Sequence, residues 1–128
     1  MANSKRLLIV DDSEEILISF YEFFISKGYD VETATDGLAA LKLLRDPNHH
    51  FDCLITDLVM PNISGVGLIS IVKREFTHMK IIAMTGYGNP PSELASEAAA
   101  DMVLPKPVDP YTIEEKVIDL LEKQTDTQ

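Results

Sequence analysis

Two apolar segments of the sequence end in aspartates, and two others end next to a hydroxyl and an ammonium. Asp11 and Asp12 follow the first segment, Asp57 ends the third, Thr85 follows the fourth and Lys106 follows the last. If these segments are parallel strands of one sheet, their carboxyl ends share the edge where open α/β sheets bind ligands. Three carboxylates, a hydroxyl and an ammonium gathered there suit a metal-assisted phosphoryl acceptor.

The bulk composition limits the class of protein. A chain of 128 residues fits one domain, and 45% hydrophobic and 25% charged residues are ordinary for a globular fold. The balance of 11 basic and 21 acidic residues gives a formal charge of −10. Such a charge repels nucleic acid and anionic membranes, and no basic face is evident in the sequence. We therefore expect neither as a partner.

The lone cysteine and the amino-terminal segment bear on location. Cys53 has no second cysteine to pair with, and its apolar neighbours favour a reduced, buried thiol. The first residues lack the apolar stretch of a signal peptide, and no run approaches the ~18 apolar residues of a membrane helix. These features predict a cytoplasmic location.

Short apolar runs alternate with stretches of helical period along the whole chain, which is typical of βαβ units around a parallel sheet. We count five rounds. The predicted strands are residues 7–10, 30–34, 51–57, 80–84 and 102–104. The predicted helices follow Ser13, span 38–45, follow Gly65, start at about Ser92 and follow Asp109.

Capping residues and apolar spacing support these helices. Ser13 can cap the first helix, Gly28 can end it in a left-handed turn, and Asp109 with Pro110 can begin the last helix. Asp36 and Gly37 are expected to form a turn. The residues predicted to face the core are Ile16, Phe20, Phe23, Phe24, Leu68, Ile71, Val72, Ile113, Val117, Leu120 and Leu121.

Four motifs at successive strand ends resemble the receiver domain of two-component response regulators, in a stand-alone, chemotaxis-regulator-like form. These motifs are Val10 to Ser13, Asp57 with Met60, Pro61 and Gly65, Thr85 with Gly86, and Lys106 with Pro107. The resemblance implies a flavodoxin-like (βα)5 doubly wound parallel sheet with strand order 2-1-3-4-5. It covers residues 4–123 as one domain and leaves 124–128 as a frayed tail.

The same resemblance implies a role for each site residue. Asp57 is expected to accept a phosphoryl group from a phosphohistidine of a sensor histidine kinase or a histidine phosphotransfer protein. Mg²⁺ or Mn²⁺ would be held by Asp11, Asp12, Asp57 and the main-chain carbonyl of Val59, with Thr85 and Lys106 stabilising the transferred oxygens.

By this resemblance the domain is a switch that assists its own phosphorylation and dephosphorylation, not a turnover enzyme. Its output is expected to be a downstream protein target or a second copy, bound at the surface of helix 4, strand 5 and helix 5.

Two positions, Val103 and Val59, differ from the usual pattern of the family. Val103 occupies the place where many receiver domains carry an aromatic switch residue, so the usual rotamer change is not expected. Val59 is apolar where the family faces the phosphoryl donor or water, which predicts slow self-dephosphorylation. The Lys106–Pro107 peptide bond is often cis in the family, and the sequence by itself leaves the choice between cis and trans open.

Two other functions compete with this interpretation. An aspartate-nucleophile phosphatase uses similar groups, but its Asp-x-Asp pattern after the first strand is absent from Asp11, Asp12 and Ser13. A phosphorylation-independent scaffold with a vestigial site is the other alternative. Each residue also has a simpler interpretation when it is taken singly: Asp11 and Asp12 could do no more than cap the first helix, and Lys106 could be an ordinary surface charge.

Overall fold

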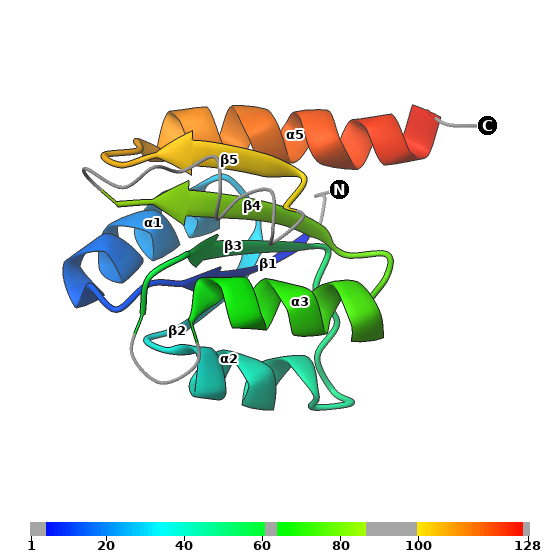
Figure 1. The fold of residues 1–128 in the computed structure, drawn as a ribbon. Helices are drawn as coiled ribbons and strands as arrows, with labels where there is room; N and C mark the ends of the chain where they lie inside the picture. The colour runs from blue at the N-terminus through cyan, green and yellow to red at the C-terminus, as the bar shows by residue number, and fades with distance from the viewer. Residues whose placement is uncertain (1–4, 61–63, 87–99, 127–128) are drawn as a thin grey trace.

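The computed structural model describes residues 5–60, 64–86 and 100–126. Five parallel strands form one sheet in the order β2-β1-β3-β4-β5, and their directions all agree in Figure 1. The strands are β1 (Arg6–Val10), β2 (Asp30–Ala34), β3 (Cys53–Asp57), β4 (Lys80–Thr85) and β5 (Met102–Pro105). This confirms the predicted fold class and strand order.

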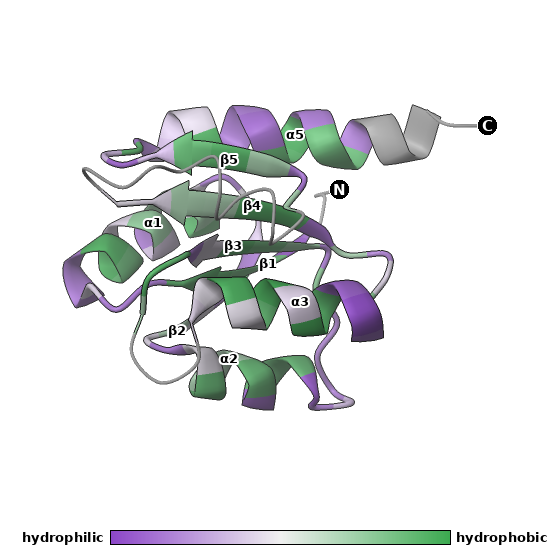
Figure 2. Ribbon diagram, viewed as in Figure 1, coloured by the Kyte–Doolittle hydropathy of each residue, from purple (hydrophilic) through white to green (hydrophobic). Residues whose placement is uncertain are grey.

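Helices cover both faces of the sheet. On one face lie α1 (Glu14–Ser26) and α5 (Pro110–Asp126), and on the other lie α2 (Gly37–Leu44) and α3 (Gly65–Glu75) (Figure 1). Because both faces are covered, the middle of each central strand is apolar, as the green colouring of β3 and β4 shows in Figure 2, and polar residues stand only toward the strand ends. The helix predicted from about Ser92 lies outside the described residues.

The core has two halves, one on each face of the sheet. The half under α1 and α5 contains Leu17, Phe20, Phe24, Ile113, Val117 and Leu121, packed on Leu7, Ile9 and Ile55. The half under α2 and α3 contains Ala40, Leu41, Leu44, Leu68, Ile69 and Val72, packed on Leu8, Leu54 and Ile81. Fully burying one such large side chain contributes roughly 1.5–3 kcal/mol.

The helix termini follow the sequence closely, with one correction. The Oγ of Ser13 accepts from the N–H of Ile16 at 3.3 Å, and Asp109 Oδ1 accepts from the N–H of Thr112 at 2.9 Å, as their capping roles predict. Asp36 also accepts from the N–H of Ala39, at 2.8 Å. Asp36 is thus the N-cap of α2 and Gly37 its first residue, so the expectation of a separate turn there was wrong.

Two details of the core differ from the sequence prediction. Leu17 and Ile69 are buried but were not predicted, whereas four of the predicted core residues are only partly buried and pack against the core: Ile16, Phe23, Ile71 and Leu120. In α3 the buried stripe follows Gly65, Leu68, Ile69 and Val72 because the helix turns that face to the sheet. The helix α5 continues to Asp126, into the segment 124–128 predicted to fray.

Gly28 ends α1 as predicted. Its φ of 95° is in the left-handed region that favours glycine, and its N–H donates to the carbonyl of Ile25 at 3.0 Å. This turn sends the chain directly back into β2.

Candidate functional site

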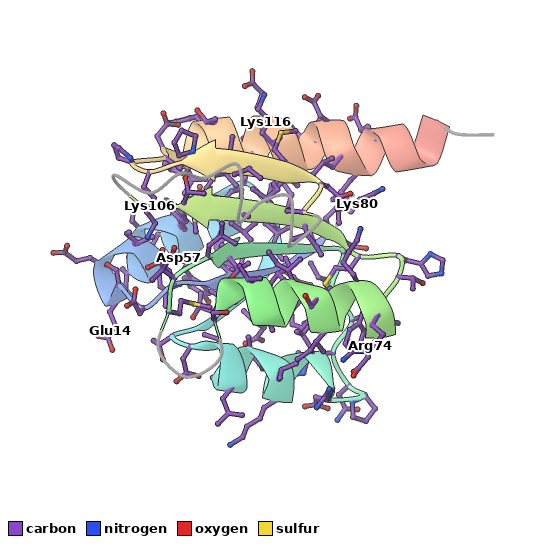
Figure 3. All side chains as sticks on the ribbon, viewed as in Figure 1. Glu14, Asp57, Arg74, Lys80, Lys106 and Lys116 are labelled. Carbon is purple, nitrogen blue, oxygen red and sulfur yellow. The ribbon has the colours of Figure 1, made fainter. Side chains whose placement is uncertain are left out.

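The predicted site residues lie at the carboxyl edge of the sheet. Asp57 is the last residue of β3 and Thr85 is within the end of β4, while Asp11 and Lys106 directly follow β1 and β5. Figure 3 shows Asp57 and Lys106 at this edge, with Arg74 and Lys80 at the opposite end of the domain. The parallel strands therefore gather groups that are far apart in sequence.

Three carboxylates form the centre of this site. One oxygen from each of Asp11, Asp12 and Asp57 lies within 4.8 Å of the other two. Asp11 is fully buried and Asp57 is 5% exposed, whereas Asp12 is exposed. Asp11 turns inward because its N–H donates to the carbonyl of Ala34 at 3.2 Å and its Oδ1 accepts from the N–H of Ser13 at 2.9 Å.

Lys106 joins two of these carboxylates. Its Nζ lies 2.9 Å from Asp11 Oδ2 and 3.0 Å from Asp57 Oδ2. The Lys106–Pro107 bond is cis, the form common in the family and the choice that the sequence left open. Burial alone lowers the pKa of the Lys106 ammonium, but its close contacts with the carboxylates of Asp11 and Asp57 more than offset this effect, so its pKa lies above the ordinary value. The lysine therefore stays charged beside the acids.

The carboxylate of Asp57 sits in a low-dielectric position. Burial raises its pKa above the ordinary value, although the Lys106 ammonium and the N–H of Val59, which donates to Asp57 Oδ1 at 3.3 Å, act in the opposite direction. Ionised Asp57 is thus held by two donors in a place that otherwise disfavours negative charge. A further cation near it would lower its pKa.

The donor set fits a hard divalent cation. Three carboxylates face one ammonium, so negative charge remains that Lys106 does not neutralise. Carboxylate oxygens are the ligands that Mg²⁺ prefers, and the exposure of Asp12 leaves an open side where the ion can keep its waters. These residues are suited to bind Mg²⁺ or Mn²⁺.

Gly65 has a role at the site that sequence reasoning did not find. A Cβ on this residue would overlap the carbonyl oxygen of Asp57 and lie 2.6 Å from the Cα of Leu58. The N–H of Gly65 donates to the carbonyl of Leu58 at 3.0 Å. The first turn of α3 therefore packs directly on the backbone that carries Asp57. Its place in the family motif was the signal, but only the fold shows the contact.

A cleft of about 530 Å³ opens beside Lys106, between α1 and the segment that links β5 to α5. Its apolar wall includes Ile16, Phe20, Met84 and Val108, and Glu15 also lines it.

The three histidines lie away from the acidic cluster, as predicted. His49 and His50 lie between α2 and β3, and His78 lies between α3 and β4, at the other end of the sheet.

The fold and the site together define a class: a flavodoxin-like α/β domain with a cluster of three aspartates at the carboxyl edge of its sheet. The family model of the response regulator receiver domain matches residues 7–118, and the chain belongs to this family. Its members are signalling domains of two-component systems. In the part of the chain that the structure describes, no helix combines the length and apolar character needed to span a bilayer.

Solved structures of receiver domains resemble this chain over nearly its full length. A CheY-like receiver domain protein from Methanospirillum hungatei is 32% identical with a TM-score of 0.87, covering 96% of this chain and 98% of that one. The response regulator TrrA from Thermotoga maritima, solved in complex with Mg²⁺-BeF, is 34% identical with a TM-score of 0.79, covering 91% and 98%.

Curated relatives are longer proteins. Sensor kinase CckA from Brucella abortus is 28% identical across 97% of this chain, which corresponds to 13% of the kinase. The chain spans at most about half the length of the first curated relatives it matches.

Proposed function

We propose that Asp57 accepts a phosphoryl group from a phosphohistidine of a sensor histidine kinase or a histidine phosphotransfer protein. The observation that carries this proposal is the placement of the Asp57 carboxylate, within 4.8 Å of two other acids and 3.0 Å from the Lys106 ammonium. Membership of the receiver family and the Mg²⁺-BeF complex of TrrA support it.

The transfer is a displacement at phosphorus. An Asp57 carboxylate oxygen forms the new P–O bond, the P–N bond to the donor imidazole breaks, and the nitrogen keeps that electron pair. The transition state spreads negative charge over three equatorial oxygens. A divalent cation held by Asp11, Asp12, Asp57 and the Val59 carbonyl would supply the charge that brings these anions together.

Lys106 and Thr85 are proposed to stabilise the transferred oxygens. Lys106 already reaches Asp57 Oδ2, so a phosphoryl group on Asp57 would draw the ammonium to its own oxygens. Thr85 ends the neighbouring strand with 2% exposure, and its carbonyl accepts from the N–H of Lys106 at 2.9 Å. Any shift of Lys106 is therefore coupled to the end of β4.

The output is proposed to pass through the surface of helix 4, strand 5 and helix 5, to a protein target or a second copy; the predicted helix 4 lies outside the described residues. Val103 lies in β5 opposite Ala83 of β4 and packs partly buried against the core. This small side chain cannot make the aromatic rotation seen in many receiver domains, so the Thr85–Lys106 link is the proposed route.

Val59 is proposed to make the phosphorylated state long-lived. Val59 lies two residues after Asp57 and is 56% exposed, yet its side chain has no group that can orient an attacking water by hydrogen bonding. The domain is thus proposed to act as a switch that assists its own slow dephosphorylation.

A cytoplasmic location stays a prediction. The fully buried thiol of Cys53 favours it.

Intact-protein mass after incubation with Mg²⁺ and acetyl phosphate tests the proposal. We expect a gain of about one phosphoryl group that requires Mg²⁺, is abolished in Asp57→Asn and is retained in the control Asp119→Asn, which alters an exposed acid of α5. No gain by a folded protein that binds Mg²⁺ would contradict acceptance from a small donor and favour the phosphorylation-independent scaffold.

A further inference from the structure

A row of exposed apolar side chains runs along α1 without a partner among the described residues. Ile18 is 59% exposed, and Tyr21 and Ile25 are each 43% exposed. Their i, i+3, i+7 spacing places them on one face of the helix. We call these three residues the α1 stripe.

The α1 stripe lies on the side of the helix away from α5. The opposite side is marked by Phe23, whose ring packs edge-on against Tyr111 of α5 at 4.8 Å between centroids. Leu17, Phe20 and Phe24 point to the sheet. The stripe therefore belongs neither to the phosphoryl site nor to the surface of strand 5 and helix 5.

The surroundings of the α1 stripe are acidic. Glu14 and Glu22 lie one turn before and after Ile18 and are exposed, and the helix contains no lysine or arginine. Figure 3 shows Glu14 projecting away from the body of the domain. The nearest basic residue in sequence, Lys27, is directed to the other side, with its Nζ 5.4 Å from the Phe23 ring centroid.

We propose that the α1 stripe binds an amphipathic helix of a partner protein in which lysines or arginines flank a row of apolar residues. A straight helical stripe suits the i, i+3, i+4, i+7 anchors of such a helix. Its basic flanks would meet Glu14 and Glu22, which steers association and orients the two helices.

The same acids argue against two other occupants. A second copy related by a twofold axis would bring Glu14 and Glu22 against their own equivalents, on a chain with a formal charge of −10. Anionic lipid headgroups would likewise be repelled by these glutamates. Because the stripe is separate from Asp57, this interface does not depend on the proposed phosphorylation.

Calorimetric titration with a synthetic peptide tests this interface. The probe is a capped helical peptide with leucines at i, i+3, i+4 and i+7 and lysines on its flanks; a version with glutamates in place of the lysines is the charge control. We expect saturable binding of the lysine peptide, weakened at least tenfold by the double variant Ile18→Ser, Ile25→Ser and clearly weakened by Glu22→Lys. The glutamate peptide should not bind.

Matched variants on α5 distinguish binding at the α1 stripe from non-specific binding of the peptide to the protein surface. Ile118→Ser changes an apolar residue that is 39% exposed, and Glu115→Lys reverses an exposed acid; neither should change the affinity. Amide shifts of the labelled protein should centre on Ile18, Tyr21 and Ile25. Equal affinity for the native chain and the double variant, or equal losses for the α5 variants, would overturn the proposal.

Two further outcomes would assign the surface to another occupant and equally overturn the proposal. One is a dimer of the native chain, seen by sedimentation velocity, that becomes a monomer in the double variant. The other is co-sedimentation with phosphatidylcholine and phosphatidylglycerol vesicles that the double variant abolishes. Because the substituted side chains are exposed, circular dichroism should show an unchanged fold in both cases.

Discussion

Removal of Asp12 should separate cation binding from the stability of the fold. Asp12 is the exposed member of the acidic cluster, whereas Asp11 and Asp57 are buried and paired with Lys106. In Asp12→Ala one of the three carboxylates is lost without a cavity in the core. We expect the metal-free variant to be as stable as the native chain or slightly more so, because like-charge repulsion falls.

The magnitude follows from linkage. A ligand that binds only the folded state stabilises it by ~2.7 kcal/mol at about 100 times its Kd. For 128 residues, an unfolding entropy of about 2.1 cal/mol/K per residue converts this to a rise in Tm of roughly 10 °C. If Asp12→Ala weakens Mg²⁺ binding about a hundredfold, the same Mg²⁺ concentration leaves ~0.4 kcal/mol, a rise of roughly 1.5 °C.

Thermal unfolding with and without Mg²⁺ measures both quantities. Glu14→Ala is the matched control, because it removes an exposed acid of the first turn of α1 that is outside the cluster. It should keep the full rise in Tm, and NaCl at equal ionic strength should not reproduce that rise in either protein. A rise of the native size in Asp12→Ala would refute the assignment of this carboxylate to the cation site.

Three other changes test the site. Gly65→Ala should lower the free energy of unfolding by about 1–3 kcal/mol in urea titrations, because its Cβ meets the backbone of Asp57 and Leu58, whereas Ser70→Ala on the exposed side of α3 should not. Burial raises the folded-state pKa of Asp57, so the folded chain favours the protonated carboxyl group. The resulting contribution to the free energy of unfolding is fully present below the unfolded-state pKa of about 3.9 and is lost as pH rises through the folded-state pKa. Asp57→Asn should therefore be more stable than the metal-free native chain at neutral pH, with a difference that shrinks toward pH ~3.9; a constant difference would contradict this reasoning. Val59→Asn should speed loss of the phosphoryl group, followed by mass, because an amide can orient water; decay no faster than in Val59→Ala would count against it.

Much of the fold could be predicted because its signals are local. Ser13 and Asp109 cap helices through bonds that span three residues, and Gly28 needs only its own φ. Strands buried on both faces leave continuous apolar runs, which the sequence displays directly. The strand order came from the resemblance, since local patterns do not determine which strands are neighbours.

The remaining features depend on long-range packing. Ile69 and Ile71 are equally apolar, and only the docking of α3 on the sheet decides that Ile69 is buried. Asp11 and Asp12 are identical and adjacent, yet the turn after β1 buries one and exposes the other. No pattern in the sequence distinguishes the two members of either pair.

By itself, the sequence determined the alternation of strands and helices, the caps and the types of chemical group at the strand ends. These depend on periodicity, on capping hydrogen bonds between near neighbours and on the family motif. Only the tertiary structure decided that the Nζ of Lys106 reaches both Asp11 and Asp57, and that Gly65 lies against the backbone carrying Asp57. These contacts require separate strands to be placed side by side, and that placement is a property of the whole packed chain.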